Sequence, residues 1–340
     1  MSHLFLFALS AAFTLMTISL PLQAQAKAQN TEGSNSGSRQ QLANSLGKDF
    51  QLPHDYVFST LKKARFHPSI IDRMNTPYEA RPYSEYRPLF VNHSLANMGR
   101  SYIKENKAVL SKVEKDYGVQ PGIIAAVLGM ETKYGRNRGK DRVLDSLYTL
   151  ATGHPRRANF FRQELGHFLT MCREEDLLPE QILGSYAGAF GTTQFIPSSF
   201  RHFAVDADAD GKRDIWESPP DIISSVGNYF REHGWDAKRP VAYWLPSLPS
   251  HPLLNELRHK GIKAWKPLKE LRNIGLPDLP EGWQDDDRVT LIDLATSEGS
   301  RTVLIHYNFY VITRWNRSYN YAMAITELAE MLACEMCKTR

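Results

Sequence analysis

A mostly apolar segment, residues 117–136, constrains the fold of this chain more than any other. Pro121 has the fixed backbone angle that suits the first turn of a helix, and Gly135 is a suitable residue for the end of one. Apolar side chains recur between them at helical spacing: Ile124, Val127 and Leu128. The pattern predicts a short, buried helix.

Glu131 interrupts this apolar stripe, because the helical period places a carboxylate where an apolar side chain is expected. Burial and the negative potential of the helix C-terminus would both raise the pKa of Glu131. A carboxyl group that is protonated near neutral pH can serve as a general acid. Alternatively, Glu131 reaches solvent at the helix end or pairs with Lys133 or Arg136, and spacing alone leaves both interpretations open.

The length and charge of the chain limit its possible domain organisation and partners. With 340 residues it can form one large domain or two to three smaller ones. The formal charge of +4 and the sequence pI near 8.8 are modest, and there is no block of Lys and Arg, so nucleic acid is not an expected partner.

The first residues have the composition of a secretory signal peptide, 1–26, with a cleavage site after Ala26. Its start lacks Lys and Arg, so an uncleaved membrane anchor is the alternative. No cysteine precedes Cys172, and a lipoprotein is therefore not expected. Residues 27–48 are rich in Ser, Asn, Gln and Gly and are predicted to form a disordered tether.

The remaining cysteines, Cys334 and Cys337, are spaced so that a small disulfide loop could close. The surrounding pattern is helical and no strand-helix-strand context accompanies it, which disfavours a thioredoxin-like redox site. A cysteine metal site would need a second pair of ligands.

Three further segments carry candidate binding residues. The segment 81–90 combines aromatic residues with arginines, which can stack on sugars and bind carboxylates, although packing explains the aromatics as well. Arg156 and Arg157 are adjacent, so on a helix at most one would face a cleft. In 184–200, glycines allow close backbone approach, but packing does not readily explain the polar Gln194.

Residues 206–217 match the template of an EF-hand calcium loop. The expected ligands are the carboxylates of Asp206, Asp208 and Asp210, the backbone carbonyl of Lys212 and the carboxylate of Glu217. Two prolines follow Ser218 and are expected to break the usual exiting helix. Since sensors normally pair two such loops, a single structural Ca²⁺ is predicted, with no organic cofactor.

The run 129–135, Gly-Met-Glu-Thr-Lys-Tyr-Gly, and the later motifs resemble the B-type lytic murein transglycosylases, bacterial enzymes with a lysozyme-like core. The resemblance extends from about Asp49 to the C-terminus. It implies that Glu131 is the single catalytic acid and base. In that family the last acid of the calcium loop comes later and matches Asp221, so Glu217 and Asp221 are rival ligands.

The resemblance also implies a set of residues that bind the glycan. Trp315 stands where tyrosine is commoner, and Ser185 and Gln194 match positions that contact the catalytic glutamate or the sugar acetamido group. The matching positions in this sequence are Tyr86, Arg156, Arg157, Ser185, Gln194, Tyr229, Asn316 and Tyr321.

The expected fold is mainly α, with a lysozyme-like catalytic core and a small antiparallel β insertion. The predicted divisions are a helical region with the core and the acidic loop (206–221) over 49–235, a β-containing subdomain over 236–304, and a helical segment completing the groove over 305–340. Strand-like patterns at 288–294 and 302–307 support the insertion.

The implied function is non-hydrolytic cleavage of the β-1,4 bond between N-acetylmuramic acid and N-acetylglucosamine in periplasmic peptidoglycan. Glycan strands are then the expected binding partner, and other cell-wall enzymes are further candidates. Membrane attachment is expected only if the N-terminal segment stays uncleaved. Three alternatives are a hydrolytic muramidase, a non-catalytic peptidoglycan-binding protein and a calcium-responsive protein. The intact Glu131, Ser185 and Gln194 argue against a disabled site, and the lone acidic loop argues against a sensor.

Overall fold

The computed structural model describes residues 37–74 and 81–333. The predicted signal peptide, 1–26, and the pair Cys334 and Cys337 lie outside the described residues. Cys172 is buried, and burial raises the pKa of its thiol above the usual range. Within the described ranges, no helix is both long enough and apolar enough to cross a membrane.

Residues 37–50 form a helix, which corrects the prediction of a disordered tether over 27–48 for its described part. Three side chains of this helix belong to the core: Leu42, Ala43 and Leu46. Their spacing places them on one helical face, which outweighs the polar composition of the segment. Arg39 Nε also donates a hydrogen bond to Tyr148 Oη at 3.1 Å, so the helix is anchored to a segment more than a hundred residues away.

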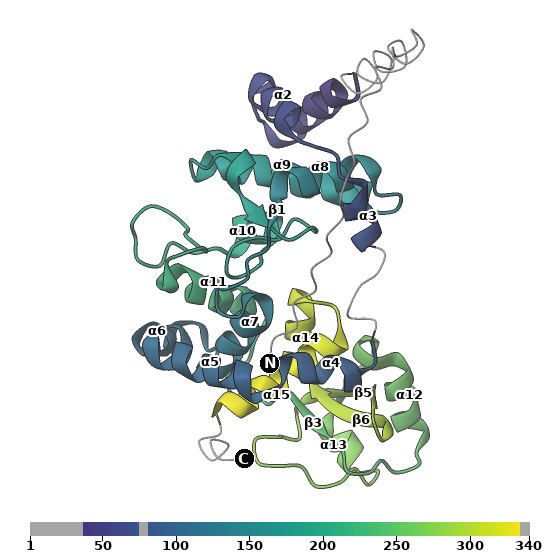
Figure 1. Ribbon diagram of the computed structural model, residues 1–340. Coiled ribbons are helices and arrows are strands. Elements are labelled where there is room, and N and C mark those ends of the chain that lie inside the picture. Colours follow the sequence, from purple (N-terminus) through teal and green to yellow (C-terminus); the bar gives the residue numbers. More distant parts are fainter. Residues whose placement is uncertain (1–36, 75–80, 334–340) are drawn as a thin grey trace, which may run out of the picture.

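Short helices follow and pack at the upper end of the molecule in Figure 1, against α8 and α9. Tyr56 Oη donates to the carbonyl of Leu169 at 2.9 Å across this contact. The elements concerned are α2 (His54–Lys63), α3 (Pro68–Met74), α8 (Val143–Gly153) and α9 (Ala158–Glu174).

The remaining helices before the large sheet form the middle and lower parts of Figure 1. They are α4 (Tyr83–Phe90), α5 (His93–Glu105), α6 (Lys107–Tyr117), α7 (Pro121–Thr132), α10 (Pro197–Phe203) and α11 (Pro219–Glu232), with a 3-10 turn η2 (Pro179–Gln181). Helix α7 lies at the centre, where α5, α11 and the C-terminal helix α15 (Tyr319–Ala333) pack against it. This explains why nearly every side chain of α7 is apolar.

Two antiparallel sheets accompany the helices in the described chain. The smaller one pairs β1 (Asp141–Arg142) with β2 (Leu183–Gly184). The larger has the order β3-β6-β5-β4, with β5 and β6 joined by a tight hairpin. Its strands are β3 (Ala242–Trp244), β4 (Lys266–Pro267), β5 (Arg288–Thr296) and β6 (Gly299–His306), and α12 (Pro252–Lys260), η3 (Gly261–Lys263) and α13 (Leu268–Arg272) lie between β3 and β5.

The larger sheet is buried on both faces, because alternate side chains of a strand point to opposite sides. On β5, Leu291 packs into a separate cluster with α12 and α13, whereas the next residue, Ile292, joins the main core. The sheet therefore attaches the small subdomain to the helical body. The chain is mainly α with a small antiparallel insertion, as the sequence predicts. After β6, α14 (Tyr307–Trp315) and α15 return to the body.

Candidate active site

Helix α7 carries Glu131 to the edge of the core. The three residues of the predicted stripe, Ile124, Val127 and Leu128, are fully buried. The helix begins at Pro121 but ends at Thr132, earlier than Gly135, because Lys133 already has left-handed backbone angles, with φ 50°. Glu131 therefore lies in the last turn, and its side chain is half-buried.

Gly129 allows the chain after Glu131 to fold back closely onto α7. A Cβ atom at position 129 would lie 2.5 Å from Tyr134 Oη, and one at Gly99 of α5 would lie 2.4 Å from the same atom. Tyr134 has φ 59°, an uncommon angle for a residue with a side chain. Its ring thus occupies a gap left by two glycines and fixes the end of the helix that carries Glu131.

Two side chains from the C-terminal helices donate hydrogen bonds to one oxygen of Glu131. Tyr321 Oη lies 2.6 Å and Trp315 Nε1 lies 3.0 Å from Glu131 Oε1. Burial, and next the charge of Glu131, raise the pKa of Tyr321 well above its usual range, so its hydroxyl stays protonated and remains a donor. Sequence reasoning did not include Trp315 among the site residues, although its indole N–H was the available signal.

Aromatic rings form a wall around Trp315. Tyr229 meets it edge to face with ring centroids 4.7 Å apart, and the Phe195 ring lies 5.1 Å away. Tyr229 and Tyr86 are buried, with Tyr86 against Phe90, and burial raises the pKa of Tyr229. Tyr229 therefore packs against Trp315, and Tyr86 is part of the buried core.

A groove of about 1410 Å³ opens beside Trp315. Of the residues predicted to bind substrate, Arg157 and Asn316 line it. The guanidinium of Arg157 lies 4.6 Å from the ring centroid of Phe160, which is partly exposed, so this wall offers both charge and an aromatic face. Trp315 connects the groove to the carboxylate of Glu131.

Arg156 and Arg157 lie in a turn, which corrects the expectation that they share a helix. Helix α9 begins only at Ala158, and the N–H groups of both arginines donate to His154 Nδ1 at 3.2 Å. Both side chains are exposed, but only Arg157 lines the groove. One of the two arginines therefore lines the groove, but from a turn and not from a helix.

Ser185 and Gln194 hold the glycine-rich segment in shape. Ser185 Oγ accepts from the N–H groups of Ala187 at 3.3 Å and Ala189 at 3.1 Å. Gln194 Nε2 donates to the carbonyls of Gly191 at 2.9 Å and Arg138 at 3.1 Å. The hydrogen bonds of both side chains therefore go to the main chain, and neither goes to Glu131.

The residue after Glu131 is linked to the acidic loop through Thr192. Thr132 Oγ1 donates to the Thr192 carbonyl at 2.9 Å. Thr192 in turn donates from its N–H to the carbonyl of Ile215 at 2.8 Å and from Oγ1 to that of Trp216 at 3.1 Å. Three hydrogen bonds thus join the end of α7 to the end of the loop.

In the loop, the side chains of Asp206, Asp208 and Asp210 converge, with one oxygen of each lying within 4.8 Å of the others. Oxygens that share one Ca²⁺ at 2.3–2.6 Å can lie at most about 5 Å apart, so this spacing fits a calcium ion. Gly211 has φ 90°, the left-handed angle that the sixth position of such a loop requires. Lys212 follows, its N–H donating to Asp210 Oδ1 at 2.9 Å.

The two rival acids differ in their surroundings. Glu217 is largely exposed and pairs with Arg138, whose Nη1 lies 2.5 Å from Oε1. Asp221 is fully buried and accepts 2.7 Å hydrogen bonds from the N–H groups of Ala207 and Asp214, at the two sides of the loop. Burial is the main cause that raises the pKa of Asp221.

The prolines after the loop begin α11, which corrects the expectation that they break an exiting helix. Pro219 is the first residue of the helix, where its missing N–H costs nothing. Ser218 caps this end, its side chain accepting from the Asp221 N–H at 3.4 Å.

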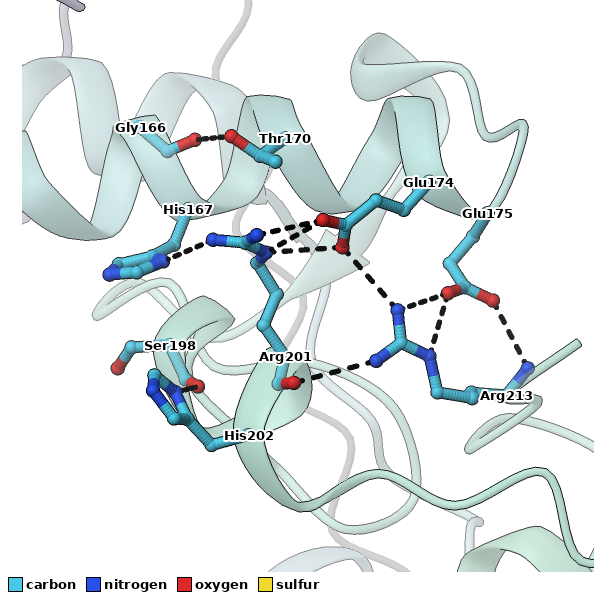
Figure 2. A network of polar contacts seen from close by, with 9 residues as sticks. All are labelled: Gly166, His167, Thr170, Glu174, Glu175, Ser198, Arg201, His202 and Arg213. Atoms are coloured by element: carbon cyan, nitrogen blue, oxygen red, sulfur yellow. Dashed lines mark hydrogen bonds and ion pairs between the residues drawn. The ribbon is translucent and has the colours of Figure 1, made fainter. Parts of the chain in front are cut away.

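An ion-pair network fastens the other side of the loop to α9 and α10 (Figure 2). Arg213 donates from Nε to Glu175 Oε1 at 2.7 Å, and its N–H donates to Oε2 at 3.1 Å. Arg201 of α10 binds Glu174 through Nη2 at 2.7 Å and contacts His167. Hydrogen bonding to Arg201 is the main cause that lowers the pKa of Glu174.

Comparison of the sequence with known proteins agrees with the family resemblance of its motifs. The model of the family described as "Transglycosylase SLT domain" matches residues 36–330. Membrane-bound lytic murein transglycosylase B of Escherichia coli (strain K12) is 38% identical over 253 residues, which cover 73% of this chain and 66% of the relative.

Solved structures agree with the fold. Soluble lytic transglycosylase SltB1 of Pseudomonas aeruginosa superposes with a TM-score of 0.77 at 36% identity, covering 87% of this chain and 98% of the other. Escherichia coli lytic transglycosylase Slt35 in complex with calcium gives a TM-score of 0.76 at 32% identity, covering 89% and 94%. The predicted lysozyme-like core is confirmed, and the chain belongs to the SLT transglycosylase family.

Proposed function

We propose that this protein is a lytic murein transglycosylase that cleaves the β-1,4 bond between N-acetylmuramic acid and N-acetylglucosamine in peptidoglycan. The observation that carries this proposal is the half-buried Glu131, whose Oε1 accepts from Tyr321 and Trp315 beside a long groove. Family membership and the activities named for the relatives support it.

A single carboxyl group has to act as acid and base. Ordinary glycosidases use two carboxylates that flank the bond. Among the described residues, Asp293 is the one acid that lines the groove, and it accepts from Arg258 Nη2 at 2.6 Å and Thr302 Oγ1 at 2.7 Å. Because Asp293 is already neutralised by Arg258, the chemistry falls to Glu131.

In the first step, Glu131 donates its proton to the glycosidic oxygen, and the bond between that oxygen and C1 of the muramic acid breaks. Because Tyr321 and Trp315 both donate to Oε1, the transferred proton is expected on Oε2. The carboxylate then accepts the proton of the C6 hydroxyl as this oxygen bonds to C1. An internal nucleophile has a high effective molarity, so the product is a 1,6-anhydro ring.

The predicted binding residues take roles that follow from their contacts. Both N–H groups of the Gln194 amide are used by the loop, so its Oε1 is available to accept the N–H of a sugar acetamido group. Arg157 and Asn316 line the groove and are proposed to bind the glycan along it, with Arg156 next to Arg157 in the same turn. Tyr321 holds the carboxylate, whereas Tyr86, Tyr229 and Ser185 hold the surrounding walls.

The acidic loop is proposed to bind one structural Ca²⁺ through Asp206, Asp208, Asp210 and the carbonyl of Lys212. Spacing of the three carboxylates supports this, as does the calcium in the related Slt35 structure. The ion would neutralise the clustered charges and stiffen the loop. Asp221 is the better candidate than Glu217 for the remaining ligand, because hydrogen bonds from Ala207 and Asp214 hold its carboxylate between the two sides of the loop, whereas Glu217 is exposed and pairs with Arg138.

Export to the periplasm, with cleavage after Ala26 and no lipid anchor, completes the proposal. The relative in Escherichia coli is named as membrane-bound. N-terminal sequencing of the exported protein decides between a processed chain that begins near Lys27 and an anchored one that begins at Met1 or Ser2.

The activity is tested with purified peptidoglycan, by measuring the muropeptides released by the wild type and by Glu131→Gln. The variant is nearly isosteric but cannot donate a carboxyl proton, so turnover should fall by orders of magnitude while glycan binding persists. Glu232→Gln, at an exposed site on α11, is the matched control. Full activity of Glu131→Gln would refute the site.

A further inference from the structure

A second cavity, of about 750 Å³, borders the groove at Tyr83. The groove is lined by residues 81–83 and 293–295, and the cavity by residues 83–84 and 296–298. The two hollows therefore follow the same pair of segments, the start of α4 and the end of β5, and Tyr83 belongs to both. A ligand lying in the groove is therefore next to the cavity along these two segments.

The buried carboxylate of Glu327 organises the cavity wall. Its Oε1 accepts from Trp244 Nε1 at 2.9 Å, and its Oε2 accepts from Arg87 Nε at 2.5 Å. Since Arg87 is bound only through Nε, no described residue accepts a hydrogen bond from its two terminal nitrogens. Glu327 thus fixes a guanidinium so that its outer edge faces the cavity.

A second guanidinium lies on the same wall. Arg301 lies over the Trp244 ring, 4.9 Å from its centroid. Within the described chain, its side chain forms no ion pair with a carboxylate. Two acids at the border of the cavity, Glu298 and Glu330, likewise form no ion pair with a described residue. Burial, and next the charge of Glu327, raise the pKa of Glu330 and disfavour its charged form. The cavity therefore offers a ligand two cations, Arg87 and Arg301, and the carboxylate of Glu298.

We propose that this cavity binds the stem peptide that substitutes the muramic acid lactyl group of peptidoglycan. Such a peptide carries free carboxylates together with an amino group. The guanidinium groups of Arg87 and Arg301 match the carboxylates, and the carboxylate of Glu298 matches an ammonium group. This inference rests on the proposed function, because it requires that glycan occupies the neighbouring groove.

A second sugar chain fits the cavity less well. Sugars bind proteins largely by stacking on aromatic faces, but the Trp244 ring is already engaged by Arg301 and lies 5.9 Å from the Tyr83 ring. Charged groups of both signs are better suited to a zwitterionic peptide. We therefore expect the cavity to distinguish peptide-bearing from naked glycan.

The test compares two substrates: glycan strands that retain their stem peptides and strands from which an amidase has removed them. Arg301→Gln removes the exposed guanidinium and is measured on both. Arg288→Gln is the matched control, because this arginine lies on the same sheet, 5.8 Å from the centroid of Tyr307, and away from the cavity. Equal melting temperatures of the variants and the wild type confirm that folding is unchanged.

For Arg301→Gln, kcat/KM on peptide-bearing strands should fall roughly tenfold, as expected for the loss of a charge-assisted hydrogen bond. On stripped strands it should equal the wild type, and Arg288→Gln should equal the wild type on both. An equal loss on both substrates, or no loss on either, would overturn the inference. If the wild type cleaves neither substrate, the proposed function itself fails, so the two failures are distinguishable.

A binding measurement gives a second readout. A free stem tripeptide that ends in a diamino diacid is titrated into the Glu131→Gln variant in a calorimeter. It should bind with an affinity that falls as the salt concentration rises. Adding Arg301→Gln or Glu298→Gln should each weaken that binding. Unchanged affinity in both double variants would contradict the placement of the peptide in this cavity.

Discussion

Trp315 and Glu131 are 184 residues apart in the chain and are joined by a 3.0 Å hydrogen bond from the indole N–H to the carboxylate. The same indole lines the groove. An indole nitrogen can only donate, whereas a tyrosine hydroxyl can donate or accept. The indole of Trp315 can therefore only donate to Glu131, and this hydrogen bond holds the carboxylate next to a side chain that lines the groove.

Replacing Trp315 with Phe should lower kcat roughly ten- to hundredfold, because a hydrogen bond to a charged group contributes about 1.5–3 kcal/mol. Trp315→Tyr restores a donor and should recover much of the loss. Trp265→Phe is the control, since its indole donates to the nearby carbonyl of Ile262 and not to the site. Steady-state kinetics with equal losses in Trp315→Phe and Trp265→Phe would show that the effect is general packing.

Calcium should raise the melting temperature, because an ion that binds only the folded loop adds RT ln(1 + [L]/Kd) to the free energy of unfolding. This is about 2.7 kcal/mol at a calcium concentration of one hundred times Kd. Asp206→Asn combined with Asp210→Asn should abolish the shift and leave some activity at moderate temperature. Glu217→Gln should keep the shift if Asp221 is the remaining ligand. Identical melting curves in EDTA and in excess calcium would show that the loop binds no calcium.

Gly129→Ala should destabilise the protein by about 1–3 kcal/mol, the usual cost of overpacking. An added methyl group would lie 2.5 Å from Tyr134 Oη, and the displacement would reach Glu131 two residues away, so activity should fall as well. Gly37→Ala is the control, because an added Cβ there meets nothing within 4 Å. Denaturant unfolding measures the stability of both variants. An unchanged free energy of unfolding in Gly129→Ala would mean that Tyr134 moves aside without cost.

The ion pair between Glu174 and Arg201 should stabilise the fold in a pH-dependent way. Hydrogen bonding to Arg201 lowers the pKa of Glu174 in the folded state, below its ordinary value of 4.5. The stabilisation is therefore present above about pH 4.5 and is lost as the pH falls through the folded pKa. The difference in melting temperature between the wild type and Glu174→Gln should shrink from pH 7 to pH 3, and a constant difference would contradict this.

Local patterns predicted the parts of the structure that depend on local physics. Helical spacing predicted the buried α7, and alternating strand patterns predicted the hairpin of β5 and β6. The spacing of the acids predicted Asp206, Asp208 and Asp210 as calcium ligands, and their side chains do converge. These features follow from residues close together in the chain.

Features that depend on distant partners were predicted less well. The helix 37–50 has a polar composition, but Leu42, Ala43 and Leu46 pack into the core and Arg39 binds the distant Tyr148. The donor role of Trp315 and the pairing of Glu217 with Arg138 likewise depend on residues far away in the sequence. No local pattern reports such contacts.

The central claim is that Glu131 transfers protons to and from the sugar while the C6 hydroxyl, and not water, attacks C1. The direct test is digestion of purified peptidoglycan in water enriched in oxygen-18, followed by mass spectrometry of the released muropeptides. The account predicts 1,6-anhydromuramic acid ends that carry no oxygen-18 from the cleavage, formed by the wild type and lost in Glu131→Gln. Reducing muramic acid ends that have incorporated one labelled oxygen at each cut, formed during the cleavage itself, would identify a hydrolase and contradict the account.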